Sequence, residues 1–272
     1  MILVPLLAGL FGLLIGSFLN VCIYRMPRDL SVVTPRSYCP ECNHTIAWYD
    51  NIPLVSYALL GAHCRRCGHR IPLRYPVVEL LTGLQFFFAV RFLGTTLAAA
   101  KFAVFGAIMI ALVFSDLEER ILPDEFTLGG TALGVIFAAF VPVTGGILLL
   151  IFYNSKHPGL ISVFDSLLAA GVYSGALWAL RTVYEKLRHR EGMGLGDVKM
   201  AAMIGAFLGL QAALLAFMVG SLLGVVVGVS YAWFTGKDAS TYELPFGSFL
   251  GIAALAVGFY EVIFNLYGRL GV

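Results

Sequence analysis

Charged residues are scarce in this chain. Asp, Glu, Lys and Arg make up only 12% of its 272 residues, whereas hydrophobic residues make up 59%. A soluble domain carries about 25% charged residues, so this composition excludes an ordinary soluble globular protein. The formal net charge of +2 says little about partners, because the distribution of charges carries that information. We expect no nucleic acid among the partners.

Long apolar segments occupy most of the chain instead. A bilayer core about 30 Å thick needs about 20 apolar residues per crossing helix. A further apolar run over 147–152 is too short to cross. The sequence therefore predicts an all-α polytopic membrane protein with about eight transmembrane helices, the sixth and seventh separated only faintly. The eight segments run approximately over 3–24, 76–94, 97–116, 126–143, 161–184, 197–211, 212–234 and 246–267.

The first apolar segment lacks the basic start of a secretory signal peptide and runs on through Asn20 into Arg25. We therefore interpret it as a retained helix. Lys and Arg collect in cytoplasmic loops. With eight spans and both termini outside, 14 of the 18 basic residues fall on the inner side. This asymmetry predicts that the polar segment over 25–75 faces the cytoplasm.

The segment over 25–75 carries two CxxC pairs separated by 21 residues, Cys39 with Cys42 and Cys64 with Cys67. Four thiolates satisfy the tetrahedral preference of Zn²⁺ and typically form a closed structural site. A loop of this size is too small to form a large hydrophobic core, so a bound metal ion would supply stability that the loop otherwise lacks. Two disulfides are the alternative, which a reducing cytoplasm disfavours.

Two carboxylates are candidates for chemistry. Asp197 closes the segment Gly192-Met193-Gly194-Leu195-Gly196-Asp197. A charge at bilayer depth costs at least about 2.5 kcal/mol, which makes such a residue a functional candidate. Glycines without a Cβ let another chain approach the backbone, as a peptide site requires. The alternative is a glycine-rich turn whose Asp caps the next helix.

Asp116 ends the third apolar segment, and the predicted topology places it on the same side as Asp197. If the two helices pack together, the like charges cannot both ionise cheaply and the pair holds a single proton. Such a pair performs protease chemistry, in which the ionised acid activates water and the neutral acid polarises the scissile carbonyl. Asp124 is a plausible helix N-cap and the substitute for Asp116. Glu79 lies near the same interface and either supports a site or pairs with a loop arginine.

Six short motifs follow one another along the chain. They are Gly16-Ser17-Phe18-Leu19-Asn20-Val21 with Tyr24-Arg25, Cys39-Pro40-Glu41-Cys42, Trp48-Tyr49-Asp50-Asn51-Ile52-Pro53, Arg74-Tyr75-Pro76 with Glu79, the Asp116 to Asp124 stretch, and Gly194-Leu195-Gly196-Asp197-Val198-Lys199. Taken together and in this order, they resemble the motifs of the bacterial type IV prepilin peptidases, which belong to the GxGD aspartyl proteases. The resemblance covers nearly the whole chain.

The resemblance implies a bifunctional enzyme of the bacterial inner membrane with its active site facing the cytoplasm. It implies cleavage of type IV prepilins and type II secretion pseudopilins after a glycine. It further implies methylation of the new N-terminus with S-adenosyl-L-methionine. The family's two catalytic aspartates fall on Asp116 and Asp197, and Gly194, Gly196 and Lys199 belong to the second aspartate's motif. The 25–75 segment lacks the glycine-rich turn after a strand that usually binds nucleotides, so the prediction of methylation depends on the resemblance alone.

We accordingly divide the chain into a first transmembrane helix (1–24), a cytoplasmic tetra-Cys domain (25–75) and a seven-helix membrane catalytic domain (76–272) carrying both aspartates. One alternative is a proton- or cation-coupled transporter that uses the same carboxylates. Another is a zinc-loop scaffold without catalysis. A transport site is expected near the bilayer midplane, whereas both acids lie at one face, and a scaffold leaves the two acids unexplained.

Overall fold

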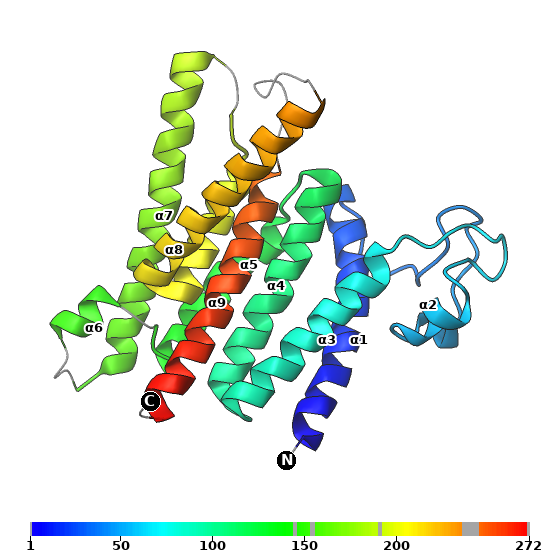
Figure 1. Cartoon of the computed structure of the whole chain (residues 1–272), viewed down its shortest axis with the longest axis horizontal. Coiled ribbons are helices and arrows are strands. Elements are labelled where there is room, and N and C mark those ends of the chain that lie inside the picture. Colours follow the sequence, from blue (N-terminus) through cyan, green and yellow to red (C-terminus); the bar gives the residue numbers. More distant parts are fainter. Residues whose placement is uncertain (1, 144–145, 153–155, 190–191, 236–244, 271–272) are drawn as a thin grey trace. The chain divides into compact units, whose positions relative to one another are not determined.

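The computed structural model of the chain describes residues 2–143, 146–152, 156–189, 192–235 and 245–270. Regular structure in these residues is helical, apart from two isolated β-bridges, which confirms the predicted all-α class. The elements in chain order (Figure 1) are α1 (Leu3–Arg25), η1 (Met26–Arg28), η2 (Trp48–Asn51), α2 (Val55–Leu59), α3 (Arg74–Leu93), α4 (Leu97–Glu119), α5 (Asp124–Phe140), α6 (Ile147–Ile151), α7 (Pro158–Arg188), α8 (Leu195–Thr235) and α9 (Phe246–Leu270).

Six of the described helices are long and apolar enough to cross a membrane, namely α1, α3, α4, α7, α8 and α9. Two differences from the eight predicted segments account for this number. The predicted fourth span is α5, which has only 17 residues. The predicted sixth and seventh spans both lie within α8, which has 41 residues. The run over 147–152 forms the five-residue helix α6, which is too short to span, as predicted.

Helix α8 is interrupted at Gly209. A straight helix of its length would measure about 60 Å, twice the thickness of a bilayer core. Gly209 instead has φ 77° and ψ −175°, a non-helical conformation that divides the element into 195–208 and 210–235. Residues with a Cβ rarely adopt this backbone conformation, so glycine is the residue that permits the break. The predicted border between the sixth and seventh spans lies two residues further along.

The chain forms two compact units, Met1–Ser115 and Asp116–Val272. In the first, α1 packs along α3 at close range, since a Cβ at Gly16 would lie 2.6 Å from the Cα of Glu79. The amide of Asn20 donates to the carbonyl of Tyr75 at 3.0 Å across the same contact. Small residues at such contacts are typical of helices packed within membranes. The predicted division at residues 24 and 75 stays a prediction.

In the second unit, α8 packs against α5, α7 and α9 (Figure 1). The hydroxyl of Ser166 on α7 donates to the carbonyl of Ala206 on α8 at 2.8 Å. A Cβ at Gly205 would lie 2.7 Å from the backbone of Ala169, so these two helices also approach closely. This packing holds the N-terminal ends of α5, α8 and α9 in one unit, and the candidate site is built there.

Candidate active site

Asp116 lies in the last turns of α4 and is buried, with 6% of its surface exposed. One oxygen of its carboxylate, Oδ2, accepts two hydrogen bonds from the same residue at the start of α9. The backbone N–H of Ser248 donates at 2.6 Å and its hydroxyl Oγ donates at 2.7 Å. Burial of a carboxylate is costly without such donors, and these two compensate for part of the lost hydration.

Asp197 lies in the first turn of α8 and is half-buried. The backbone N–H of Gly194 donates to its carboxylate, and the charge of Asp116 acts on it electrostatically. A first-turn acid that reaches back to the N–H before the helix is a helix-capping arrangement. Capping, the alternative interpretation of this Asp, therefore describes its local contact, while the proximity of Asp116 is a second feature that capping does not explain.

Leu122 is the apolar residue around which the site is assembled. A Cβ at Gly196 would lie 3.0 Å from the Cβ of Leu122, and a Cβ at Gly247 would lie 3.1 Å from both Leu122 Cδ1 and Asp116 Oδ2. The turn after α4, the start of α8 and the start of α9 therefore meet at one point. Larger residues at the two glycines would force these segments apart. Gly196 is thus closely approached by Leu122 of the same chain, whereas Gly194 is exposed. The approach of a peptide substrate to these glycines stays a prediction.

Asp124 and Lys199 form an ion pair at the edge of this site. Lys199 Nζ lies 2.7 Å from each carboxylate oxygen of Asp124, and the pair links the first turn of α5 to the first turns of α8. The prediction that Asp124 is an N-cap is wrong, because Pro123 occupies that position and Asp124 is the first residue of α5. Its carboxylate forms the ion pair with Lys199 on a neighbouring helix.

Glu79 belongs to the first unit, where it is buried with 8% exposure. Its Oε2 accepts a hydrogen bond from the backbone N–H of Leu54 at 2.9 Å, and the Ser17 side chain also bonds to the carboxylate. Glu79 thus ties the loop before α2 to the contact between α1 and α3. Its observed partners are a backbone N–H and a hydroxyl rather than the loop arginine considered as an alternative.

The four cysteines of the two CxxC pairs lie together, with all four Sγ atoms within 4.8 Å of one another. The Sγ atoms of Cys39 and Cys67 are 3.8 Å apart. A tetrahedral Zn²⁺ with Zn–S bonds of about 2.3 Å requires sulfur atoms about 3.8 Å apart, so the donor set fits this metal. All five cysteines of the chain are free thiols, so the disulfide alternative does not describe this loop.

The two pairs sit in matching turns. The N–H of Cys39 donates to the carbonyl of His44 at 2.9 Å, and the N–H of Cys64 donates to that of His69 at 2.8 Å. In each turn the residue after the second cysteine has positive φ, 53° at Asn43 and 69° at Gly68. Backbone N–H groups of Cys67 and Arg66 lower the pKa of the Cys64 thiol to about 6, whereas burial and the neighbouring sulfurs raise the pKa of Cys67. Without a metal ion, the cluster therefore favours a thiolate at Cys64 in particular.

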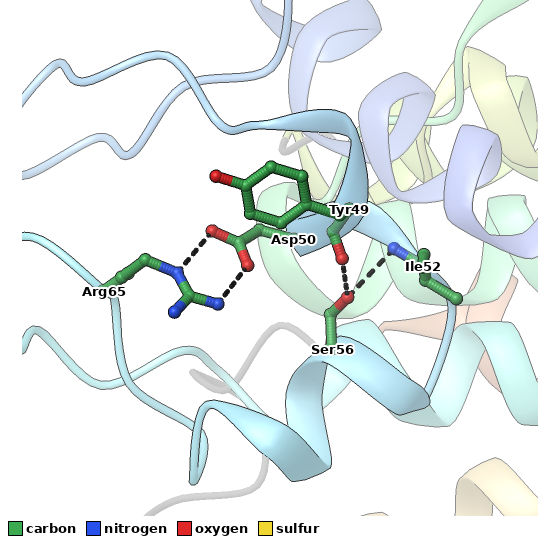
Figure 2. Close-up of polar contacts among 5 residues, drawn as sticks. All are labelled: Tyr49, Asp50, Ile52, Ser56 and Arg65. Carbon is green, nitrogen blue, oxygen red and sulfur yellow. Dashed lines mark hydrogen bonds and ion pairs between the residues drawn. The ribbon is translucent and has the colours of Figure 1, made fainter.

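An ion pair braces the same loop (Figure 2). Arg65, next to the third cysteine, donates from Nε and Nη2 to the two carboxylate oxygens of Asp50, at 2.9 and 2.7 Å. These hydrogen bonds from Arg65 lower the pKa of Asp50. The hydroxyl of Ser56 in α2 donates to the carbonyl of Tyr49 at 2.8 Å and accepts from the N–H of Ile52 at 3.0 Å. The segment between the two cysteine turns is thereby held to the second turn.

The fold and these two sites define a polytopic helical membrane protein with a paired-aspartate site and a four-thiol loop. Two protein-family models match this chain. The family model described as type IV leader peptidase family matches residues 103–229, and the one described as bacterial peptidase A24 N-terminal domain matches residues 10–92. The chain belongs to the type IV leader peptidase family.

Individual relatives agree with this assignment. A Myxococcus xanthus protein is 40% identical over 85% of this chain and 64% of its own length. An Aeromonas hydrophila protein is 34% identical over 91% of this chain and 87% of its own length. A Pseudomonas aeruginosa protein is 32% identical, with coverages of 90% and 86%. All three are named prepilin leader peptidase/N-methyltransferase. No solved structure matches the chain. The relatives give no support to a transporter.

Sequence reasoning missed Ser248. It follows Pro245, Phe246 and Gly247 at the start of the last apolar segment, and a hydroxyl at a helix start is unremarkable in a sequence. The signal in the sequence was Gly247, directly before Ser248, because a residue without a Cβ allows another segment of the chain to approach closely. Only the packing of α9 shows that the approaching group is the carboxylate of Asp116.

Proposed function

We propose that this chain is a membrane aspartyl endopeptidase that cleaves the leader from type IV prepilins and related pseudopilins, and then methylates the new N-terminus. The observation that carries the proteolytic half is the meeting of Asp116 and Asp197 within one compact unit. Their segments are 81 positions apart in the chain (197 − 116) and converge on Leu122. The names of the relatives support both halves of the activity.

The two carboxylates act as a pair that shares one proton. The ionised member takes a proton from a water molecule as the water oxygen attacks the scissile carbonyl carbon. The neutral member donates its proton to the carbonyl oxygen, which would otherwise develop a full negative charge. When the resulting intermediate collapses, the carbon–nitrogen bond breaks, the leaving amine takes up the first proton and the hydroxyl proton returns to the second acid.

The membrane positions the substrate. A prepilin consists of a short basic leader followed by an apolar helical segment, and insertion of that segment fixes the depth of the bond to be cut. Asp116 lies at the end of α4 and Asp197 at the start of α8, so both occupy the border between apolar and polar surroundings. The asymmetry of Lys and Arg supports a cytoplasmic orientation of this border in the bacterial inner membrane.

The four-thiol loop holds a structural Zn²⁺ through Cys39, Cys42, Cys64 and Cys67. A bound Zn²⁺ stabilises the fold of the loop and takes no part in peptide hydrolysis, since four protein ligands leave no open position. The methyl donor is S-adenosyl-L-methionine, which enters the reaction as a co-substrate.

The test uses the full-length chain in detergent or lipid. The substrate is a synthetic peptide with a basic leader ending in glycine, a phenylalanine after the cleavage point and an apolar helical segment. Mass spectrometry is expected to show loss of the leader mass and, with S-adenosyl-L-methionine, the gain of one methyl group. Asp116→Asn and Asp197→Asn are each expected to lower cleavage by at least about 10³-fold, because neither half of the pair acts alone.

Two further variants make the result specific. Asp165→Asn on α7 removes a buried charge remote from the pair; the Asp165 carboxylate accepts from the N–H of Leu148, a contact that an amide oxygen preserves. It is expected to cleave like the unchanged chain. Asp124→Asn is expected to keep at least about a tenth of the activity, since an exposed ion pair contributes under about 1 kcal/mol. Full activity of Asp116→Asn or Asp197→Asn would reject the paired-aspartate mechanism.

A further inference from the structure

We propose that Ser248 is a positioning residue that holds Asp116 as the ionised member of the pair, which leaves Asp197 to carry the shared proton. This inference rests on the proposed proteolytic function and deepens it. It assigns a role to each of two acids that the amino-acid sequence treats as equivalent, and it brings the start of α9 into the catalytic arrangement.

The first support is the double contact at one oxygen. Ser248 N–H and Oγ both donate to Asp116 Oδ2, at 2.6 and 2.7 Å, and Ser248 itself is 1% exposed. Donors directed at a carboxylate stabilise its charged form, and the effect is larger where water is excluded. With Oδ2 occupied by two donors, Oδ1 is the oxygen through which Asp116 accepts the proton of the attacking water.

The second support is the position of Ser248 in the helix. Ser248 is the third residue of α9, and the first N–H groups of a helix lack acceptors within the helix. These groups carry the positive end of the helix dipole, which favours an anion. Besides a longer contact to the carbonyl of Pro245 at 3.2 Å, the Ser248 N–H reaches Asp116 Oδ2 at 2.6 Å. Gly247 allows the approach, because a Cβ there would already lie 3.1 Å from Asp116 Oδ2. The start of α9 therefore places positive partial charge beside Oδ2 of the Asp116 carboxylate.

The third support comes from the charges that act on the pair. Arg120, one turn after Asp116, attracts its charge, whereas Asp124 and Lys199 neutralise each other in their ion pair. Asp197 receives one backbone N–H, from Gly194, and is repelled by the charge of Asp116. Of the two acids, Asp116 thus has more donors and a nearby cation, so the shared proton resides on Asp197.

The test compares Ser248→Ala and Ser248→Thr with the unchanged chain. The rate of prepilin peptide cleavage is measured as kcat and KM between about pH 3 and 9, a range that brackets the ordinary titration of carboxyl groups and histidine. Loss of the hydroxyl makes the charged form of Asp116 less favourable. Ser248→Ala is therefore expected to lower kcat about tenfold, and to move the acidic limb of the pH profile about one unit higher, as for one charge-assisted hydrogen bond. KM should stay within about twofold, because the lost bond does not touch the substrate.

Ser248→Thr keeps the hydroxyl and is expected to restore both kcat and the position of the acidic limb. Ser166→Ala is the matched control, since it also removes a buried hydroxyl from the second unit. Its partner Ala206 lies nine positions along α8 from Asp197, about 14 Å away for a continuous helix. This variant should leave the pH profile unchanged. Thermal unfolding of each purified variant shows whether it is folded.

A Ser248→Ala variant with the kcat and acidic limb of the unchanged chain overturns this inference. So does a Ser248→Thr profile displaced as far as that of Ser248→Ala, which would indicate a packing defect. If Ser248→Ala does not fold, Ser248→Cys is measured in its place, because a thiol of similar size is a weaker donor and should give a smaller displacement in the same direction. These outcomes differ from failure of the proposed function, which would appear as normal cleavage by Asp116→Asn or Asp197→Asn.

Discussion

Four thiols within 4.8 Å of one another are an unfavourable arrangement without a cation, because deprotonated sulfurs repel and a small loop has little core to hold them together. In the matching turns the N–H groups of Cys39 and Cys64 donate to the carbonyls of His44 and His69, and Arg65 adds a bidentate pair with Asp50. Each of these contacts is local, yet together they preorganise four ligands. The loop therefore has the geometry of a site that one metal ion would stabilise.

Replacement of a single ligand should release that metal. Cys39→Ser and Cys64→Ser are each expected to lower the zinc content of the purified chain from about one atom to well below half, since an incomplete ligand set binds far more weakly. Inductively coupled plasma mass spectrometry measures the content. Cys22→Ala is the control, because Cys22 is buried in α1 outside the cluster. A purified chain that contains no zinc under non-chelating conditions would contradict the metal assignment.

At the scale of elements, the turn after α4 and the starts of α8 and α9 meet at the site, and the helix that carries Asp197 is broken at Gly209. The break divides 41 residues into two shorter helical segments. A single continuous helix of that length would extend far beyond the apolar core. The conformation of one glycine therefore gives the helix that carries Asp197 a length compatible with a bilayer core.

Gly209→Ala should destabilise the chain. The backbone of Gly209 lies in a region that is nearly exclusive to glycine, and a Cβ there costs on the order of 1–3 kcal/mol. Thermal unfolding in detergent is expected to show a lower midpoint. Gly224→Ala on the same helix is the matched control, since its Cβ would meet Phe249 at an ordinary 3.6 Å and alanine favours helix by up to about 1 kcal/mol. Equal midpoints for the two variants would show that the break tolerates a side chain.

At the scale of the whole molecule, the scarcity of charge and its uneven distribution predict an orientation in the bilayer. In the eight-span topology predicted from the sequence, most Lys and Arg residues fall inside, including the seven arginines between residues 25 and 75. Retention of basic loops in the cytoplasm orients such proteins during insertion. The same orientation would place the four-thiol loop in a reducing compartment, where its cysteines stay available for metal.

Thiol labelling in spheroplasts tests this orientation. Cys42 and Cys67 are exposed in the loop, so a membrane-impermeant maleimide should label the unchanged chain only after permeabilisation and removal of metal by a chelator. Thr95→Cys, in the connection between α3 and α4, should be labelled in intact spheroplasts. Labelling of the unchanged chain in intact spheroplasts, with chelator present, would place the loop on the outer side.

Part of this protein could be predicted from the order of its residues. Apolar segment length sets which stretches can be membrane helices, and the observed bounds of α1, α3 and α4 differ from the predicted ones by at most three residues. The CxxC spacing predicted the thiol cluster, because each pair lies within a single tight turn. The prediction of eight separate spans was less accurate at α5 and α8, since length alone does not show a short helix or a bend.

Short-range chemistry along the chain determined the membrane class, the four-thiol loop and the candidate acids, because composition and spacing already contain that information. The tertiary structure alone decided that Asp124 binds Lys199, 75 positions away, and that Asp116 accepts two hydrogen bonds from Ser248, 132 positions away. Such contacts depend on how helices pack, and packing reflects the shape of many side chains at once rather than any pattern within one segment.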